Sequence, residues 1–182
     1  MKTESTFMYV MRLALILLAI TAVVAAALAG VNSITAPAIA KLQAEKTQKA
    51  IEAVLPGGGE SVDFTDDSGL VSVVYQGEAG YAVQVAPAGF DGAITMMVGV
   101  DTEGNVLGIS IISHTETAGL GAVAAASTSA GEAFRGQFVG TSGSVAVTKD
   151  GGEIDSITGA TITSRAVSSG VNAALNCVAG LG

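Results

Sequence analysis

Residues 69–112 read GLVSVVYQGEAGYAVQVAPAGFDGAITMMVGVDTEGNVLGISII, and this stretch decides the fold. It holds four short segments rich in β-branched and aromatic residues, which are typical of strands: Gly69–Tyr75, Gly80–Ala86, Ile94–Val100 and Val106–Ile112. Turn residues separate the segments at Gly77, at Pro87–Gly89 and at Asp101–Gly104. Because these connections are short and contain no helix, the stretch predicts an antiparallel meander rather than strands that alternate with helices.

The residues after the meander predict helices that pack beside the sheet. A helix is expected from about Ser127 to Phe138, and one more strand over Ser144–Thr148. The final helix is expected from Ile162 to Val178, because apolar residues recur there at helical spacing. The domain is therefore predicted to be α+β, with a mostly antiparallel sheet flanked by helices.

The residues before the meander predict a helical stalk. The stretch ITAPAIAKLQAEKTQKAIEAVLPGGG runs from Ile34 to Gly59. Pro37 suits the first turn of a helix, and the pair Pro56–Gly57 is expected to end it.

An uncharged apolar run, LALILLAITAVVAAALAGV, precedes the stalk at Leu13–Val31. A cleaved signal peptide is one interpretation, since Ala27–Ala29 resembles a cleavage site. The run is longer than the apolar part of most signal peptides, which favours a retained membrane-spanning helix of single-pass type. The predicted organisation is an N-terminal tail and anchor at 1–34, a stalk at 35–60 and a folded domain at 61–182.

Charge around the anchor gives a weak indication of its orientation. Lys2 and Arg12 precede the apolar run, whereas Lys41, Lys46 and Lys49 follow it at a greater distance from the apolar edge. We expect a cytoplasmic N-terminus and a domain outside the cytoplasmic membrane.

The composition of the domain excludes several classes of function. After Lys49 the basic residues are only Arg135, Lys149 and Arg165, so the basic surface of a nucleic-acid-binding protein is absent. The chain has one cysteine, Cys177, and one histidine, His114, which cannot supply the ligands of an iron–sulfur cluster and make a haem or zinc site improbable. No metal site is expected, and redox chemistry would need an organic cofactor.

The segment after His114, HTETAGLGAVAAA, contains a G-x-G-x-x-A pattern at Gly119–Ala124. A dinucleotide-binding fingerprint is disfavoured, because six residues separate the strand end from the first glycine and no βαβ unit surrounds it. Glu116 with His114 could form an acid–base pair, although a lone histidine on a loop is more often simply hydrogen-bonded. The small residues alternatively allow a flat ligand to approach the backbone, or form an ordinary glycine-rich turn.

The second informative segment is DSITGATITSRAV, at Asp155–Val167. Thr161 falls at or next to the start of the final helix, so Thr161 or Thr163 could be its N-cap. The alternative is a phosphate site, because Gly159 and Ala160 leave space in front of a helix N-terminus that offers free N–H groups.

The sequence D-S-I-T-G-A-T resembles the flavinylation motif Asp-x-x-(Ser/Thr)-Gly-Ala-Thr of FMN-binding domains. The matching positions are Asp155, Thr158, Gly159, Ala160 and Thr161. The resemblance implies that a flavin transferase joins FMN, through its phosphate, to Thr161.

The segment His114–Gly121 is similar to the Glu-Thr-Pro-Gly-Leu-Gly stretch of the same family, with Ala118 in place of the usual proline. That likeness implies that four of its residues lie beside the flavin, namely Glu116, Thr117, Leu120 and Gly121.

The whole chain resembles the G subunits of Rnf electron-transport complexes in its anchor, the following V-N-S-I-T-A-P, the stalk ending V-L-P-G and the sheet. C subunits of sodium-translocating NADH:quinone reductases are similar. The resemblance implies a relay subunit, inactive alone, of a ferredoxin:NAD oxidoreductase coupled to Na⁺ or H⁺ transport, with other Rnf subunits as partners. A flavin subunit of another membrane reductase and a membrane-tethered sensory module remain alternatives.

Overall fold

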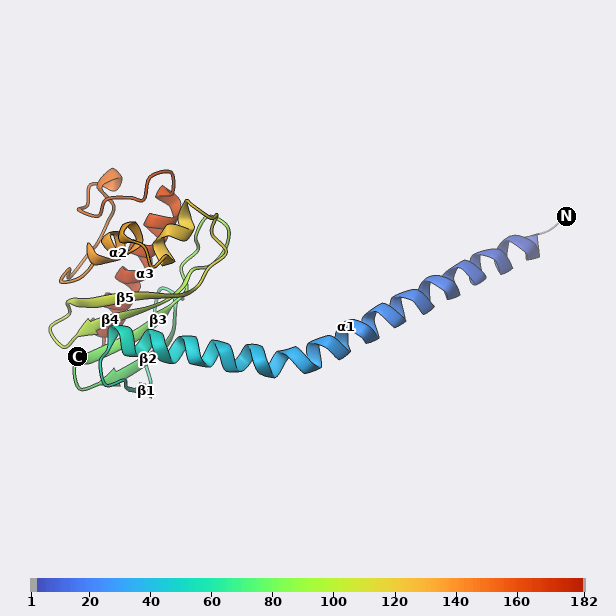
Figure 1. Ribbon diagram of the computed structural model, residues 1–182, viewed down its shortest axis with the longest axis horizontal. Coiled ribbons are helices and arrows are strands. Elements are labelled where there is room, and N and C mark those ends of the chain that lie inside the picture. The colour runs from blue at the N-terminus through green and yellow to red at the C-terminus, as the bar shows by residue number, and fades with distance from the viewer. Residues whose placement is uncertain (1–2, 182) are drawn as a thin grey trace. The chain divides into compact units, whose positions relative to one another are not determined.

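The computed structural model describes residues 3–181, and Lys2 of the charge pattern lies outside them. The chain divides into two compact units, Met1–Glu45 and Lys46–Gly182. The described residues of the first unit, 3–45, are helical, and the second unit contains the end of that helix, the sheet and the remaining helices (Figure 1).

Helix α1 spans Thr3–Val54 without a break. The expectation that Pro37 starts a separate stalk helix is wrong, because Pro37 lies inside α1. A proline removes one backbone hydrogen bond from a helix, and the good helix formers Ala36 and Ala38 on either side favour continuation. Within the described residues, α1 holds one stretch long and apolar enough to cross a membrane, and its large apolar side chains are exposed there.

The sheet has five antiparallel strands in the order β1-β2-β3-β4-β5 (Figure 1). The four strands predicted from the sequence are confirmed. A three-residue edge strand, β1, was not predicted. The strands are β1 Glu60–Val62, β2 Val71–Gly77, β3 Gly80–Val85, β4 Thr95–Asp101 and β5 Val106–Ser113.

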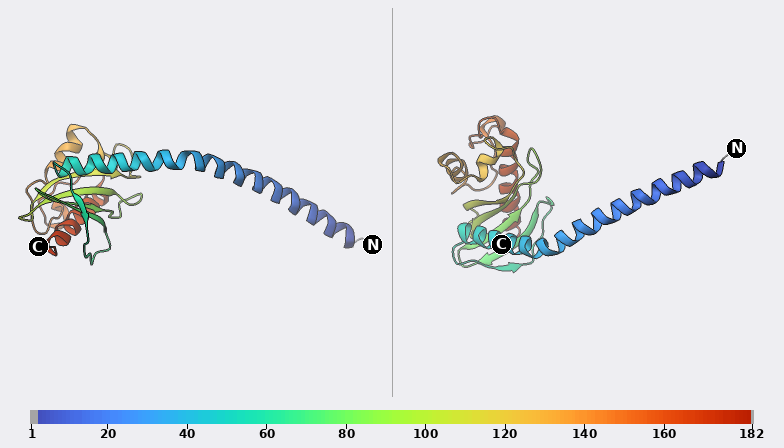
Figure 2. Two further views of the ribbon diagram at one scale, coloured as in Figure 1. Left: turned by 90° about the horizontal axis from the view of Figure 1, so that it is seen from below. Right: turned by 45° about the vertical axis from the view of Figure 1, so that its right-hand side comes forward.

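Both faces of the sheet are covered, because α3 (Thr161–Ala179) packs on one face and the last turns of α1 pack on the other (Figure 2). Side chains alternate along β4: Met96 lies in the cluster with α3 and Met97 lies in the cluster with α1. Two glycines allow the close approach. A Cβ on Gly99 would lie 2.3 Å from the Val54 carbonyl oxygen, and one on Gly170 of α3 would lie 2.3 Å from Met96 Cε.

The segment between the sheet and α3 forms short helices and loops. It contains η1 (Gly121–Ala125), α2 (Ser129–Gly136) and η2 (Thr148–Asp150). The predicted helix at 127–138 is therefore confirmed in a shorter form.

The predicted strand Ser144–Thr148 is wrong. Val147 is extended but forms only an isolated parallel bridge with Ile154, and Thr148 already belongs to η2. The N–H of Thr148 donates to the Ile154 carbonyl at 2.8 Å, and the N–H of Ile154 donates to the Ala146 carbonyl at 3.1 Å. The segment thus pairs with its own loop and does not join the sheet.

Candidate functional site

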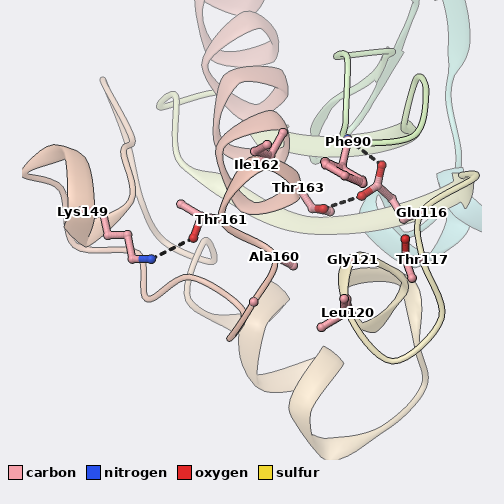
Figure 3. A pocket seen from close by; sticks show the side chains of 11 residues that line it. Phe90, Glu116, Thr117, Leu120, Gly121, Lys149, Ala160, Thr161, Ile162 and Thr163 are labelled. Carbon is pink, nitrogen blue, oxygen red and sulfur yellow. Dashed lines mark hydrogen bonds between the residues drawn. The ribbon is translucent and has the colours of Figure 1, made fainter.

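Four segments of the domain surround a cavity of about 290 Å³ (Figure 3). They are the turn before β4, the loop after β5, the loop around η2 and the first turn of α3. The cavity is lined by Phe90, Glu116, Thr117, Leu120, Gly121, Lys149, Gly159, Ala160, Thr161, Ile162 and Thr163.

The cavity brings together most of the residues that the sequence singled out. One side of the cavity is formed by Glu116, Thr117, Leu120 and Gly121. The other side is formed by Gly159, Ala160 and Thr161, which follow about forty residues later in the sequence. Asp155 and Thr158 do not line it. They line a second cavity of about 600 Å³, which also contacts Val123 and Phe134.

Glu116 joins three segments around the cavity. Its side chain is only 7% exposed. Oε1 accepts hydrogen bonds from the backbone N–H groups of Phe90 at 2.8 Å and Asp91 at 3.1 Å, and Oε2 accepts one from the hydroxyl of Thr163 in α3 (Figure 3). We call this arrangement the Glu116 clasp.

Two glycines leave room for the clasp. A Cβ on Gly89 would lie 2.4 Å from Glu116 Oε1, and a Cβ on Gly121 would lie 2.3 Å from Oε2. Real Cβ atoms do not approach an oxygen so closely, so a side chain at either position would push the carboxylate away. Gly89 before β4 and Gly121 after β5 therefore do more than form turns.

The clasp holds Glu116 in its ionised form. Burial alone would raise the pKa of Glu116, but the hydrogen bonds from Thr163, Asp91 and Phe90, with the charge of His114, outweigh burial and lower the pKa below its ordinary value of 4.5. His114 itself does not line the cavity, and its Nδ1 is buried with no hydrogen-bond partner among the described residues.

The lowered pKa predicts an acid-sensitive contribution to stability. A carboxylate whose folded pKa is depressed stabilises the fold above its unfolded pKa, and this stabilisation is lost as the pH falls through the folded value. Glu116→Gln, which retains a similar shape, is expected to lose less stability than the unchanged chain as the pH is lowered from neutral to below 4.5. Thermal unfolding of both chains across this range measures the difference. Parallel curves for the two chains would contradict the prediction.

Thr161 is the first residue of α3 and is not its N-cap. The cap position is Ala160, and no side chain caps the helix there. Thr161 Oγ1 instead accepts a hydrogen bond from Lys149 Nζ at 2.9 Å, while the hydroxyl of Thr163 is bound to Glu116 (Figure 3). The capping interpretation of the two threonines is therefore wrong, and both face the cavity.

The sequence did not identify the other lining residues, Phe90, Lys149, Ile162 and Thr163. Phe90 could have been noticed in the sequence, because it is an aromatic residue in a turn between Gly89 and Gly92, where no hydrophobic core is expected. In the structure it is 66% exposed. Lys149 carried a weaker signal as one of the few basic residues in an acidic domain.

The cavity combines apolar and charged surfaces. Phe90, Leu120 and Ile162 supply large apolar side chains, whereas Glu116 and Lys149 supply charges of opposite sign. A few convergent polar groups on apolar walls are typical of small-molecule sites. Such a lining fits a flat aromatic ligand that carries an anionic group. Within the part of the chain that the structure describes, no group of three or more histidine, cysteine or acidic residues could hold a metal ion.

Comparison with known proteins shows the family to which the chain is related. The family described as FMN-binding domain matches residues 89–176, which include the whole lining of the cavity. The G subunit of the Na(+)-translocating ferredoxin:NAD(+) oxidoreductase complex of Acetobacterium woodii is 35% identical, over 94% of this chain and 92% of the relative. The G subunit of the ion-translocating oxidoreductase complex of Methanosarcina acetivorans is 33% identical, over 87% and 89%. The chain therefore belongs to the family of G subunits of ion-translocating (Rnf) oxidoreductase complexes and contains that family's FMN-binding domain.

Proposed function

We propose that this chain is the flavin-bearing relay subunit of an Rnf-type ferredoxin:NAD oxidoreductase, and that its FMN is joined by a phosphodiester to Thr161. The observation that carries the proposal is the position of the Thr161 hydroxyl. Thr161 lines the cavity together with large apolar side chains and Lys149, and it does not cap α3.

The lining residues suit the parts of FMN. Leu120, Phe90 and Ile162 would contact the apolar isoalloxazine ring, and Gly121 and Gly159 leave the backbone accessible. FMN would supply one- and two-electron transfer, while the chain sets its surroundings. Phe90, Leu120 and Ile162 are 66%, 43% and 49% exposed, so the walls of the cavity reach the surface where a redox partner can approach.

A relay role fits the residues of the chain. The single cysteine and single histidine cannot ligate an iron–sulfur cluster, and the glycine pattern at Gly119 precedes a short 3₁₀ helix outside any βαβ unit. Electrons would therefore arrive and leave through partner subunits of the complex, coupled elsewhere to Na⁺ or H⁺ transport. Ala22, Ala25, Ala26 and Ala29 of α1 give the anchor a small-residue surface for helix–helix contact.

The proposal also includes the membrane arrangement and the maturation step. α1 would be the single anchor, with a cytoplasmic N-terminus and the FMN domain on the outer side of the cytoplasmic membrane. A flavin transferase would attach the cofactor. A covalent link suits that location, because a lost FMN could not readily be replaced there.

One preparation tests the attachment and the relay role. The full chain is purified from flavin-replete cells that contain a flavin transferase, and its peptides are analysed by mass spectrometry. The peptide spanning Thr161 is expected to carry the mass of FMN. The intact yellow chain is expected to accept electrons from a chemical reductant but to show no turnover with NADH or ferredoxin.

Two results would contradict the proposal. An unmodified Thr161 in that preparation would remove the covalent link. Appreciable turnover of ferredoxin or NADH by the isolated chain would show an enzyme rather than a relay.

A further inference from the structure

Lys149 is held in a loop with a fixed backbone. Around η2 the N–H of Gly152 donates to the Val147 carbonyl at 3.0 Å, which closes the loop beneath Lys149. Gly151 has a φ of +86°, and a Cβ on Gly152 would lie 2.0 Å from the Ala146 carbonyl oxygen. The loop therefore needs glycine at both positions to take this path.

An ion pair next to Lys149 joins this loop to α3. Arg165 donates from Nε to Asp150 Oδ2 at 2.7 Å and from a terminal nitrogen to Oδ1 at 2.6 Å. Two parallel bonds between guanidinium and carboxylate fix orientation as well as distance. Asp150 follows Lys149 directly, and Arg165 lies one helical turn after Thr161, so the pair fixes the loop beside the first turn of α3.

Lys149 is the basic side chain beside the cavity that is left without a charged partner among the described residues. Of the three basic residues after Lys49, Arg165 is paired with Asp150, and Arg135 donates to the Ala124 and Ala126 carbonyls at 2.6 and 3.1 Å. Among residues 7–181, whose side chains the structure describes, no carboxylate lies within ion-pair distance of Lys149. Its Nζ donates to Thr161 Oγ1 at 2.9 Å and lines the cavity (Figure 3).

We infer that Lys149 is the phosphate-binding residue of the flavin site, where it orients the Thr161 hydroxyl before modification and neutralises the phosphodiester afterwards. This inference rests on the proposed function. The contact itself carries it, because Nζ already lies at hydrogen-bond distance from the atom that becomes the ester oxygen. An ammonium group there offsets the negative charge that the modification adds to an acidic domain.

The direction of the hydrogen bond limits what Lys149 can do. Because Nζ donates to Thr161 Oγ1, Lys149 is not the base that removes the hydroxyl proton. In transfer from a flavin dinucleotide, the Oγ–P bond forms and the pyrophosphate P–O bond breaks. A nucleoside monophosphate leaves, and the hydroxyl proton passes to a base on the transferase. The hydrogen bond from Lys149 occupies one lone pair of the hydroxyl, which leaves the other free for attack.

The test compares free FMN with riboflavin, which differ by the phosphate. The full chain is produced without a flavin transferase, so that Thr161 is unmodified, and titrated in detergent with each flavin. FMN is expected to bind about tenfold more tightly than riboflavin, as one charge-assisted hydrogen bond allows. Lys149→Met is expected to bring the two affinities together, and Lys149→Arg to retain most of the preference. Raising the ionic strength should reduce it.

The controls separate this role from a purely structural one. Lys49→Met removes one exposed positive charge near the C-terminal end of α1 and is expected to keep the FMN preference. Thermal unfolding of each variant reports the fold, whereas the ratio of FMN to riboflavin affinity reports phosphate recognition.

Three results would each overturn the inference. The unchanged chain could bind the two flavins equally, it could bind neither, or its preference for FMN could survive Lys149→Met. The adduct on the native peptide tests the proposed function independently, so that the two can fail separately.

Discussion

Replacing Thr161 by alanine is expected to give a folded chain with no covalent flavin. Thr163 cannot replace it, because its hydroxyl donates to the buried carboxylate of Glu116. The cost in stability should be less than the roughly 1 kcal/mol of a lost helix cap, because Ala160 and not Thr161 is the N-cap. In-gel flavin fluorescence measures attachment, and thermal unfolding measures the fold.

In the assembled complex the same substitution is expected to stop electron transfer from ferredoxin to NAD while all subunits remain associated. A relay with one missing carrier transfers no electrons, so the loss should be complete rather than partial. Thr102→Ala, at an exposed turn position outside the cavity, is the matched control and should keep both flavin and activity. Normal activity of the Thr161→Ala complex, or flavin retained at another residue, would contradict the prediction.

The sequence could predict the sheet because its signals are local. Each strand from β2 to β5 carries its own run of β-branched residues and ends at a turn. The edge strand β1 is three residues long and carries too little pattern to recognise. The extended residues near Val147 have strand composition, but their hydrogen bonds go to the loop at Ile154. Pairing partners of this kind are a property of the folded chain and do not appear in composition.

The residues of the site likewise include some that a local sequence motif indicates and others that no motif indicates. Glycines and threonines in two short motifs indicated residues on both sides of the cavity. The contacts around the cavity, however, join residues that are far apart in the sequence. Glu116 binds the backbone of Phe90 and Asp91, and Lys149 binds Thr161 from a separate loop. No periodicity or spacing links such residues, so the contacts that bring Phe90, Lys149 and Thr163 into the site appear only in three dimensions.

The motif at Asp155–Thr161 is divided between two surfaces. Gly159, Ala160 and Thr161 line the first cavity, while Asp155 and Thr158 line the second one. The side-chain amide of Gln137 bonds both backbone groups of Asp155, accepting from its N–H at 2.7 Å and donating to its carbonyl at 3.3 Å. The carboxylate of Asp155 stays exposed. A direct contact of Asp155 and Thr158 with FMN remains a prediction, and their position outside the first cavity does not support it.

Gly121→Val is expected to disrupt the proposed flavin pocket severely. Its Cβ alone would lie 2.3 Å from Glu116 Oε2 and 2.5 Å from Thr163 Oγ1, so the Glu116 clasp must open. Leaving a buried carboxylate short of a partner costs about 1–3 kcal/mol, and the added methyl groups cost a further ~1–3 kcal/mol by overpacking.

We expect Gly121→Val to lower the melting temperature by several degrees and to change or abolish the flavin absorption spectrum. Gly136→Val is the matched control, because a Cβ on Gly136 meets nothing within 4 Å, and it should change neither property much. Glu116→Gln distinguishes the loss of the carboxylate charge from steric disruption of the pocket, since it keeps the shape of the clasp without its charge. If Gly121→Val folds, takes up flavin and keeps both the spectrum and the redox potential of the unchanged chain, the loop at Glu116–Gly121 does not contact the flavin. The ring would then have to lie against other residues of the domain.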